Sequence, residues 1–280
     1  SVINLQEDDI FVAMSDGCPH AGIGIAYNFG WSVKDITEYL EPLTVAGFDR
    51  AAGTVRIIFQ TVGATTAALA RLDAGDSIAD FVGPLGKPTE TEGLCNVCVI
   101  GGGVGCAIAL PVAEKLHAEG CRVTSVIGFR TRDLVILEDE FRATSDVLHV
   151  VTDDGSYARR GNVCLPLDEM LSAGEKFDRV IAIGPLVMMK FATAKAREYG
   201  IPVTVSMNPI MIDGTGMCGG CRLTLIEDGK RVVRFACVDG PDFDGYAVDF
   251  DEAMERGGMY REAERHAYAQ DCDLFGKAEG

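Results

Sequence analysis

The 280-residue sequence has little positive charge and no long apolar run. Lys and Arg together number 25 against 42 Asp and Glu, which gives a formal net charge of −17. Such a chain would repel a phosphate backbone or an anionic lipid surface, so no nucleic acid and no membrane partner is expected. No stretch of eighteen apolar residues occurs, and the first thirty residues lack a basic segment followed by an apolar one. We therefore expect a cytoplasmic protein whose ten cysteines stay reduced.

The composition otherwise favours a folded protein with more than one domain. Apolar residues make up 48% of the chain, and its length is sufficient to bury a sizeable core. Glycine is abundant, with 33 residues in 280, where the usual share is about 7%. Many tight turns, or a backbone that approaches a ligand closely, would explain this excess.

The pattern of the chain divides it into four parts. Residues 1–93 carry short β-type runs and one short helical pattern near 33–40, which together predict an antiparallel barrel. Residues 94–209 alternate strands and helices, as a doubly wound parallel sheet does. Residues 210–250 are rich in glycine and cysteine with little regular pattern, and 251–280 form an acidic, mostly helical tail. The five predicted parallel strands are NVCVIGG, RVTSVIGF, VLHVVTDD, RVIAIGP and VTVSMNP.

A glycine-rich turn follows the first strand of the predicted sheet. It contains Gly101, Gly102, Gly103 and Gly105, and it is typical of a dinucleotide site between a strand and a helix. Cys106 stands where a third glycine of the usual fingerprint would be. The second strand ends at Arg130 rather than at an acidic residue, so the choice between NAD and NADP stays open.

Further strand ends carry polar or turn residues at the same predicted edge of the sheet. The segment Asp153-Asp154-Gly155-Ser156 follows the third strand, and Gly184-Pro185 with Met188-Met189 follow the fourth. Ligands of open parallel sheets bind at the carboxyl ends of the strands. The three strand ends together therefore predict a nucleotide site.

The cysteine-rich segment has the spacing of an iron–sulfur site. It reads Asp213-x4-Cys218-x2-Cys221-x15-Cys237, and plant-type [2Fe–2S] proteins use C-x4-C-x2-C with a distant fourth cysteine. Zinc is an alternative occupant of three Cys and one Asp. Asp213 is alternatively a turn residue before a glycine. The pair Cys95-x-x-Cys98 has no second pair, and we interpret it as core packing.

These segments resemble the ferredoxin–NADP reductase superfamily. Within it, the chain is similar to iron–sulfur electron-transfer subunits related to that of dihydroorotate dehydrogenase, including the small subunits of electron-bifurcating NADH-dependent ferredoxin:NADP oxidoreductases. The resemblance covers roughly residues 40 to 250. It is carried by EPLTVAGFD, FQTVGATTAAL, FVGPLGKP, CVIGGGVG, VIGFRTRDLVILEDEFR, TDDGSYARRG, IAIGPLVMMK, SMNPIMIDGTGMCGGCRLTL and FACVDGPDFDG.

The resemblance implies an FAD in the barrel. The flavin-facing segment of the family matches Pro42, Leu43 and Thr44, and the segment that meets its diphosphate matches Gly63, Thr65 and Thr66. Where the family has an arginine two positions before the proline, this chain has Leu40. The family's ligands to a [2Fe–2S] cluster correspond to Asp213, Cys218, Cys221 and Cys237.

The function implied is electron transfer from NAD(H), with NADP(H) not excluded, through FAD and the [2Fe–2S] cluster. The partner implied is a larger FAD and iron–sulfur flavoprotein, through which ferredoxin would also be reached. Two alternatives stay open. One is the electron-transfer subunit of dihydroorotate dehydrogenase, which normally has Cys at the position of Asp213. The other is a relay or scaffold subunit without a working flavin, which the substitution at Leu40 would explain.

Overall fold

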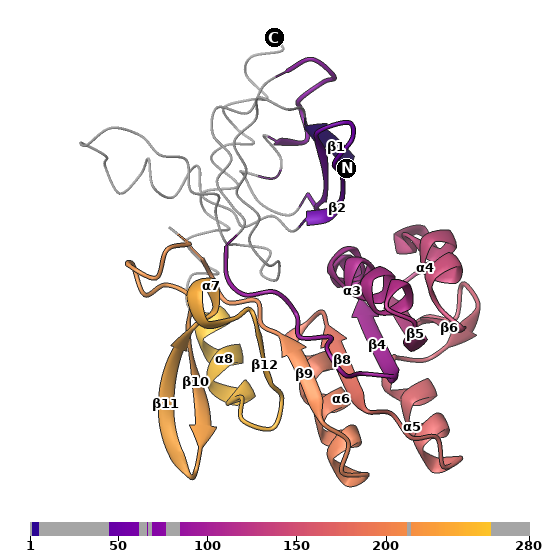
Figure 1. Cartoon of the computed structure of the whole chain (residues 1–280), viewed down its shortest axis with the longest axis vertical. Coiled ribbons are helices and arrows are strands. Elements are labelled where there is room, and N and C mark those ends of the chain that lie inside the picture. The colour runs from indigo at the N-terminus through magenta and orange to yellow at the C-terminus, as the bar shows by residue number, and fades with distance from the viewer. Residues whose placement is uncertain are drawn as a thin grey trace.

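The computed structural model describes residues 2–5, 45–61, 66, 69–76, 85–211 and 214–258. These residues form three sheets: a three-stranded antiparallel sheet, a two-stranded hairpin and a seven-stranded mixed sheet. Figure 1 shows the large sheet with its helices, the hairpin beside it, and the three-stranded sheet near helix α3. A mixed α/β architecture with a parallel sheet is thereby confirmed.

The large sheet contains the five parallel strands that the sequence predicts. In spatial order they are β9 (Val203–Ser206), β8 (Arg179–Ile183), β4 (Asn96–Gly102), β5 (Arg122–Phe129) and β6 (Val147–Thr152). Two short edge strands extend the sheet. Strand β7 (Arg159–Arg160) runs parallel to β6, and β12 (Asp242–Asp244) runs antiparallel to β9.

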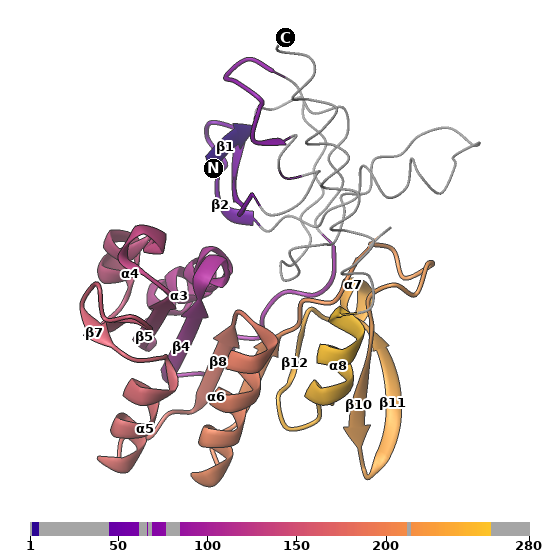
Figure 2. The same ribbon diagram turned by 180° about the vertical axis from the view of Figure 1, so that it is seen from behind.

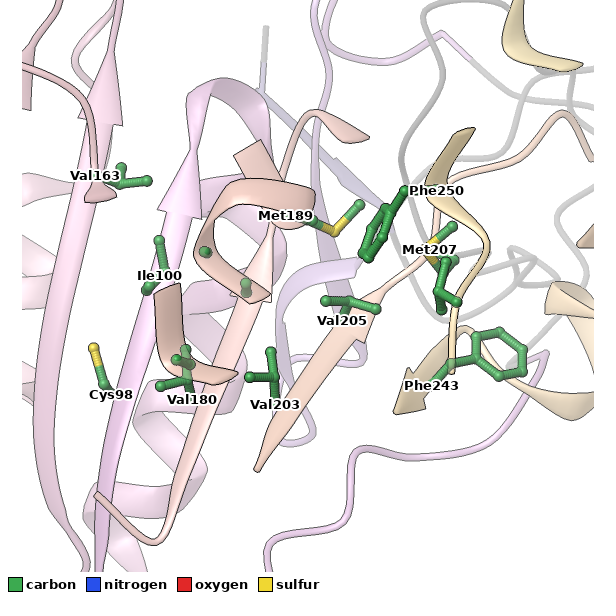
Figure 3. Packing of buried hydrophobic residues seen from close by; sticks show 14 of the residues in the cluster. Cys98, Ile100, Val163, Val180, Met189, Val203, Val205, Met207, Phe243 and Phe250 are labelled. Atoms are coloured by element: carbon green, nitrogen blue, oxygen red, sulfur yellow. The ribbon is translucent and has the colours of Figure 1, made fainter. Parts of the chain in front are cut away.

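Helices cover both faces of this sheet and create two cores. On one face, α3 (Cys106–Ala118), preceded by the short 3-10 helix η1 (Gly103–Gly105), and α4 (Glu138–Thr144) pack on alternate residues of β4 and β5. On the other face lie α5 (Cys164–Ser172) and α6 (Leu186–Glu198), seen from behind in Figure 2. Strands apolar on both faces are what a sheet covered on both sides requires. Figure 3 shows the second core, which extends from Cys98 and Ile100 of β4 to Phe243 of β12.

Two helical regions differ from the expectation. Helix α3 begins at Cys106, five residues before the predicted stretch, because the apolar residues 106–110 pack against the sheet and Pro111 is accommodated inside the helix. Helix α5 was not predicted, since its nine residues contain Pro166 and only a short apolar pattern. The short 3-10 helix η2 (Arg132–Leu134) follows β5.

The cysteine-rich region is more regular than the sequence pattern indicates. Strands β10 (Arg222–Glu227) and β11 (Lys230–Phe235) form an antiparallel hairpin, followed by α7 (Ala236–Asp239) and, after β12, by α8 (Phe250–Gly257). The hairpin turn is Asp228-Gly229, with φ of +50° and +74°. Asp-Gly between two β-type runs is a strong hairpin signal, and it was available in the sequence.

The N-terminal part is described only in its three-stranded sheet. Strands β1 (Val2–Leu5), β2 (Val45–Asp49) and β3 (Thr54–Ile58) pair antiparallel in the order β1-β3-β2. Strand β2 contacts α3 of the parallel domain. Closure of a barrel stays a prediction, because much of residues 6–84 lies outside the described part. The tail from 259 onward and the helical pattern near 33–40 lie outside it too.

A carboxylate joins the segment after the N-terminal part to the edge of the large sheet. The Oδ2 atom of Asp242 on β12 accepts a hydrogen bond of 2.6 Å from Thr89 Oγ1, and the Ser206 side chain at the end of β9 also bonds to it. Burial raises the pKa of Asp242 above its ordinary value, against the smaller lowering effect of the two hydrogen bonds. Close by, Lys87 N donates to Gly240 O at 2.6 Å.

We expect Asp242→Asn to reduce the pH dependence of stability. Because the pKa of Asp242 is raised in the folded state, folding favours its protonated form. The resulting contribution to the free energy of unfolding is complete below the unfolded pKa of about 3.9 and is lost as pH rises through the folded pKa. An asparagine can still accept from Thr89 and cannot ionise. Urea unfolding from pH 4 to 7 should show a smaller loss of free energy for Asp242→Asn than for wild type. The exposed neighbour Asp244→Asn serves as control, and equal slopes in all three proteins would contradict this.

Candidate nucleotide and iron–sulfur sites

The glycine-rich turn packs tightly against the turn that follows β8. A Cβ atom on Gly102 would lie 2.4 Å from Met188 Sδ, and one on Gly105 would lie 2.7 Å from Ile183 O. A Cβ on Gly184 would lie 3.0 Å from both Gly102 Cα and Gly102 O. Gly105 and Gly184 are therefore required because two backbone turns meet, whereas Gly102 leaves room for the Met188 side chain. The structure brings together the turns after β4 and β8, two predicted parts of the site.

Gly103 differs from its neighbours in the turn. Its φ is +57°, and a Cβ placed there would meet no atom within 4 Å. Gly101 faces inward instead, where a Cβ would lie 2.8 Å from Cys106 Sγ. Cys106 is fully buried, so the residue at the third position of the fingerprint serves the helix–strand packing. Gly103 thus has an unobstructed backbone, which a bound phosphate group needs.

Of the pair Met188-Met189 that the sequence places at this strand end, Met188 covers the turn and Met189 does not. Pro185 precedes the first residue of α6, and the side chain of Met188 reaches back over Gly102 and Gly184. Met189 is fully buried in the core between α6 and the sheet (Figure 3). Met188 is therefore the side chain of this pair that borders the candidate site.

The ends of β5 and β6 are tied together around Asp154. Asp154 N donates to Arg130 O at 3.3 Å, and Asp154 Oδ1 accepts from Ser156 N at 2.9 Å and from Ser156 Oγ at 2.7 Å. Ser156 Oγ in turn accepts from Arg132 N at 2.8 Å. The bonds from Ser156 hold the pKa of Asp154 below its usual range. The site thus contains an exposed, ionised carboxylate in a fixed position.

Cationic side chains lie around this carboxylate. Arg160 packs over Gly155 and contributes to lowering the pKa of Asp154, and the Arg132 guanidinium lies 5.6 Å from the centre of the Tyr157 ring. Arg130 is exposed at the end of β5. The sequence motif included Ser156 but gave it no role, and sequence reasoning missed Arg132 as a residue that helps to orient Asp154. The Asp-Gly-Ser order of a local turn was the available signal.

The cysteines of the predicted metal site converge from two elements. Cys221, beside the start of β10, and Cys237, in α7, are both almost completely buried, and their Sγ atoms lie 3.1 Å apart. Cys237 N donates to Cys221 Sγ at 3.5 Å, and Gly220 N donates to Cys218 Sγ at 3.3 Å. Cys218 is exposed at the tip of the same loop. Sulfur donors that receive backbone N–H groups fit an iron–sulfur cluster.

The structure describes only some of the other residues that the sequence predicts to bind the cluster or the flavin. Asp213 lies outside the described residues, so its role as a ligand stays a prediction. Among the residues that the structure describes, no group of three or more His, Cys, Asp and Glu side chains is arranged as a complete metal site. Of the predicted flavin residues, Thr66 is described and is buried. Pro42, Leu43, Thr44, Gly63 and Thr65 lie outside the described residues.

The cysteine loop begins at the same edge of the sheet as the nucleotide turns. Strand β9, which pairs with β8, ends at Ser206 and leads directly into residues 207–221. Met207 and Met211 are buried in the same core as Cys221 and Cys237. The candidate nucleotide edge and the cysteine pair are thus linked by one strand and one core.

Comparison with known proteins agrees with this arrangement. Residues 208–249 match the model of the iron–sulfur cluster binding domain of dihydroorotate dehydrogenase B. In Thermotoga maritima, a homolog of the dihydroorotate dehydrogenase B (NAD(+)) electron transfer subunit is 48% identical over 238 residues, covering 85% of this chain and 82% of the relative. The Streptococcus pneumoniae electron transfer subunit is 33% identical over 205 residues, covering 72% and 77%.

A solved structure is also similar over most of its length. It is a chain from the structure of an NADH-dependent reduced ferredoxin–NADP oxidoreductase, studied for flavin-based electron bifurcation. The TM-score is 0.75 at 47% identity, and the match covers 82% of each chain. No helix among the described residues is long and apolar enough to cross a membrane. The chain therefore belongs to the family of electron-transfer subunits of dihydroorotate dehydrogenase B and their homologs, and it carries the family's iron–sulfur binding domain.

Proposed function

We propose that this chain transfers electrons between NAD(H) and a [2Fe–2S] cluster by way of FAD, and exchanges them with a larger flavoprotein. The observation that carries this proposal is the continuity between the nucleotide edge and the cysteine loop. Strands β8 and β9 are neighbours, and the buried pair Cys221 and Cys237 shares the core of that edge. A donor site and a one-electron site on one rigid element suit electron transfer.

The residues of the nucleotide edge fit a dinucleotide. The open backbone at Gly103 suits a pyrophosphate, and the ionised carboxylate of Asp154 can accept hydrogen bonds from ribose hydroxyls. An acidic group at this position disfavours an added phosphate, which supports NAD(H) over NADP(H). The exposed guanidinium of Arg130 acts in the opposite direction, so the preference is to be measured as a ratio.

The cysteines supply the ligands that a cluster requires. Cys218, Cys221 and Cys237 would bind as thiolates, and Asp213 is the fourth proposed ligand. When bound, FAD accepts two electrons from a nicotinamide and releases them singly, and the cluster carries one electron at a time. The chain's own part is to hold the sulfur donors, to direct N–H groups at them and to shield Cys221 and Cys237 within the core.

The surface beside the cysteine loop suits a protein partner. Met217 is 86% exposed and Val238 is 43% exposed, and a Cβ on Gly216 would lie 2.7 Å from Val238 Cγ2, so these apolar side chains flank exposed Cys218. Exposed apolar groups at a redox site favour docking of another protein. The homologs named as electron transfer subunits support a larger catalytic subunit as that partner.

Two kinds of larger complex are candidates. The identity of 47% to the solved oxidoreductase chain exceeds the 33% to the streptococcal dihydroorotate dehydrogenase subunit. This difference favours a bifurcating NADH, ferredoxin and NADP oxidoreductase. The electron-transfer subunit of dihydroorotate dehydrogenase is the second candidate.

An anaerobic titration of the purified chain tests the proposed function. We expect NADH to bleach both the flavin and the cluster absorbance, and NADPH to do so at least about tenfold more slowly, which corresponds to about 1.4 kcal/mol of transition-state discrimination. Acid release should yield close to one FAD per chain. A cluster-loaded preparation without flavin, unchanged by either nucleotide, would support the relay or scaffold alternative instead.

A further inference from the structure

Cys95 has a cysteine neighbour that its sequence motif does not indicate. In the motif Cys95-x-x-Cys98, Cys98 lies on the face of β4 that packs against α5 and α6, where it is completely buried (Figure 3). Side chains alternate between the faces of a strand, so Cys95 belongs to the face of Val97. Cys121, just before β5, belongs to the same core as Val97 and Val123. At the amino ends of β4 and β5, the two thiols on this face are therefore Cys95 and Cys121, since Cys106 of the same core follows the other end of β4.

The strand register places these two residues side by side. Strands β4 and β5 are parallel, and their first paired residues are Asn96 and Arg122. Cys95 and Cys121 each precede that pair by one position, and Arg122 N donates to Cys95 O at 2.7 Å. Neighbouring strands lie about 4.8 Å apart. A disulfide bond spans Cα atoms about 4.4–6.8 Å apart, so the backbone separation suits one.

We propose that Cys95 and Cys121 form a reversible thiol–disulfide site that reacts with low-molecular-weight disulfides. The site lies at the amino edge of the sheet, opposite the edge that carries the nucleotide turns. It therefore does not depend on the proposed function. Its location at the start of the two central strands would link them covalently when it is oxidised.

The reaction balances with the small disulfide as the oxidant. The Cys95 thiolate attacks one sulfur of the small disulfide, which breaks its S–S bond, releases one small thiol and leaves a mixed disulfide on Cys95. The Cys121 thiolate then attacks Cys95 Sγ and releases the second small thiol. Two electrons pass from the protein to the small disulfide, and the two protons leave with the released thiols.

The surroundings assign the two roles. Cys95 is exposed, which allows a small disulfide to reach it. Cys121 is 5% exposed, and its pKa is raised by burial first and then by the nearby Cys95, Asp178 and Asp146. A buried thiol with a raised pKa reacts slowly with external reagents. Its position beside Cys95 gives the second exchange step a high effective concentration. The Asp178 carboxylate also fixes the position of Cys95, since Asp178 Oδ2 accepts from Cys95 N at 2.8 Å.

The test uses the full chain with its cluster, kept anaerobic and treated with oxidised glutathione. After free thiols are alkylated, digestion without reductant and mass spectrometry should find the peptide of Cys95 joined to that of Cys121, with the loss of two hydrogens. Dithiothreitol should reverse the linkage. In Cys121→Ser the reaction should stop at glutathione on Cys95, and that adduct should persist at least about tenfold longer than in wild type.

Variants of Cys164 and Cys95 serve as controls. Cys164→Ser removes a half-buried thiol outside the pair and should leave the linkage between Cys95 and Cys121 unchanged. Cys95→Ser should yield neither the linkage nor an adduct at Cys121. A wild-type chain that keeps glutathione on Cys95 as long as Cys121→Ser does, or that links Cys95 to any other cysteine, would overturn the proposal. The wild-type measurement requires no variant to fold.

Discussion

Replacing Cys221 or Cys237 with alanine is expected to abolish the [2Fe–2S] spectrum and to reduce bound iron from two atoms per chain to almost none. The Sγ atoms of the two residues lie 3.1 Å apart in the core, and Cys237 N donates to Cys221 Sγ. Each iron of such a cluster needs two protein ligands besides its bridging sulfides. Iron analysis and the electron paramagnetic resonance spectrum of the reduced protein measure the loss.

Two substitutions of Asp213, to cysteine and to alanine, test whether this residue is the fourth cluster ligand. Carboxylate is a harder donor than thiolate, so Asp213→Cys should keep two irons with a shifted potential, whereas Asp213→Ala should give a labile cluster. The substitution Cys218→Ala should also lose the cluster. The matched control is Cys164→Ala, since Cys164 lies on α5 away from the cysteine loop. If neither Asp213 variant changes the potential or the resonance spectrum, Asp213 is a turn residue and another group is the fourth ligand.

The second large effect concerns Gly103. The substitution Gly103→Val should raise the KM for NADH by about tenfold or more, equivalent to at least about 1.4 kcal/mol, because a branched side chain would occupy the open space above the turn. The residue also has a φ of +57°, which a β-branched side chain adopts only with strain. Steady-state kinetics with an artificial acceptor gives the KM. The cluster spectrum should stay unchanged.

Gly120 supplies the control for backbone strain. It follows α3, has a φ of +82°, and a Cβ there would also meet no atom within 4 Å. Gly120→Val therefore introduces a comparable conformational cost at the other edge of the sheet. If both variants lower the melting temperature similarly but only Gly103→Val raises KM, the effect belongs to nucleotide binding. Equal KM values in the two variants would place the nucleotide elsewhere.

The parallel sheet was predictable from sequence because its strands are apolar on both faces. NVCVIGG and RVIAIGP each place alternate residues in two separate cores, and a run of this kind is recognisable without knowledge of its neighbours. Short elements were harder to predict. Helix α5 and the edge strand β12 have little pattern of their own and depend on contacts with β9, α6 and the core.

The sequence indicated which turns form the candidate nucleotide site, but it did not indicate what each glycine in those turns contacts. The turn after β4 was expected to need glycine for ligand approach, yet Gly105 is required by the backbone of the turn after β8, and Gly103 has the open backbone. A single sequence does not reveal which distant backbone lies against a glycine. The hydrogen bonds from Ser156 to Asp154 are local and could have been inferred, whereas the contact between Cys221 and Cys237 spans a whole hairpin.

The pairing of β12 with β9 joins the cysteine-rich region to the large sheet, so the two should unfold together. Strand β12 adds to the sheet, and Cys221, Cys237 and Phe243 lie in the same core as Val203 and Val205. We therefore expect that the predicted domain boundary at residue 210 does not separate two cooperative units. Amide hydrogens of β9, β10 and β12 should therefore exchange with similar protection, through a shared opening. A fragment of residues 210–250 would expose the apolar side chains that pack against Val203 and Val205 in the whole chain. We therefore expect the predicted cluster-binding segment not to fold when it is grafted alone onto another protein.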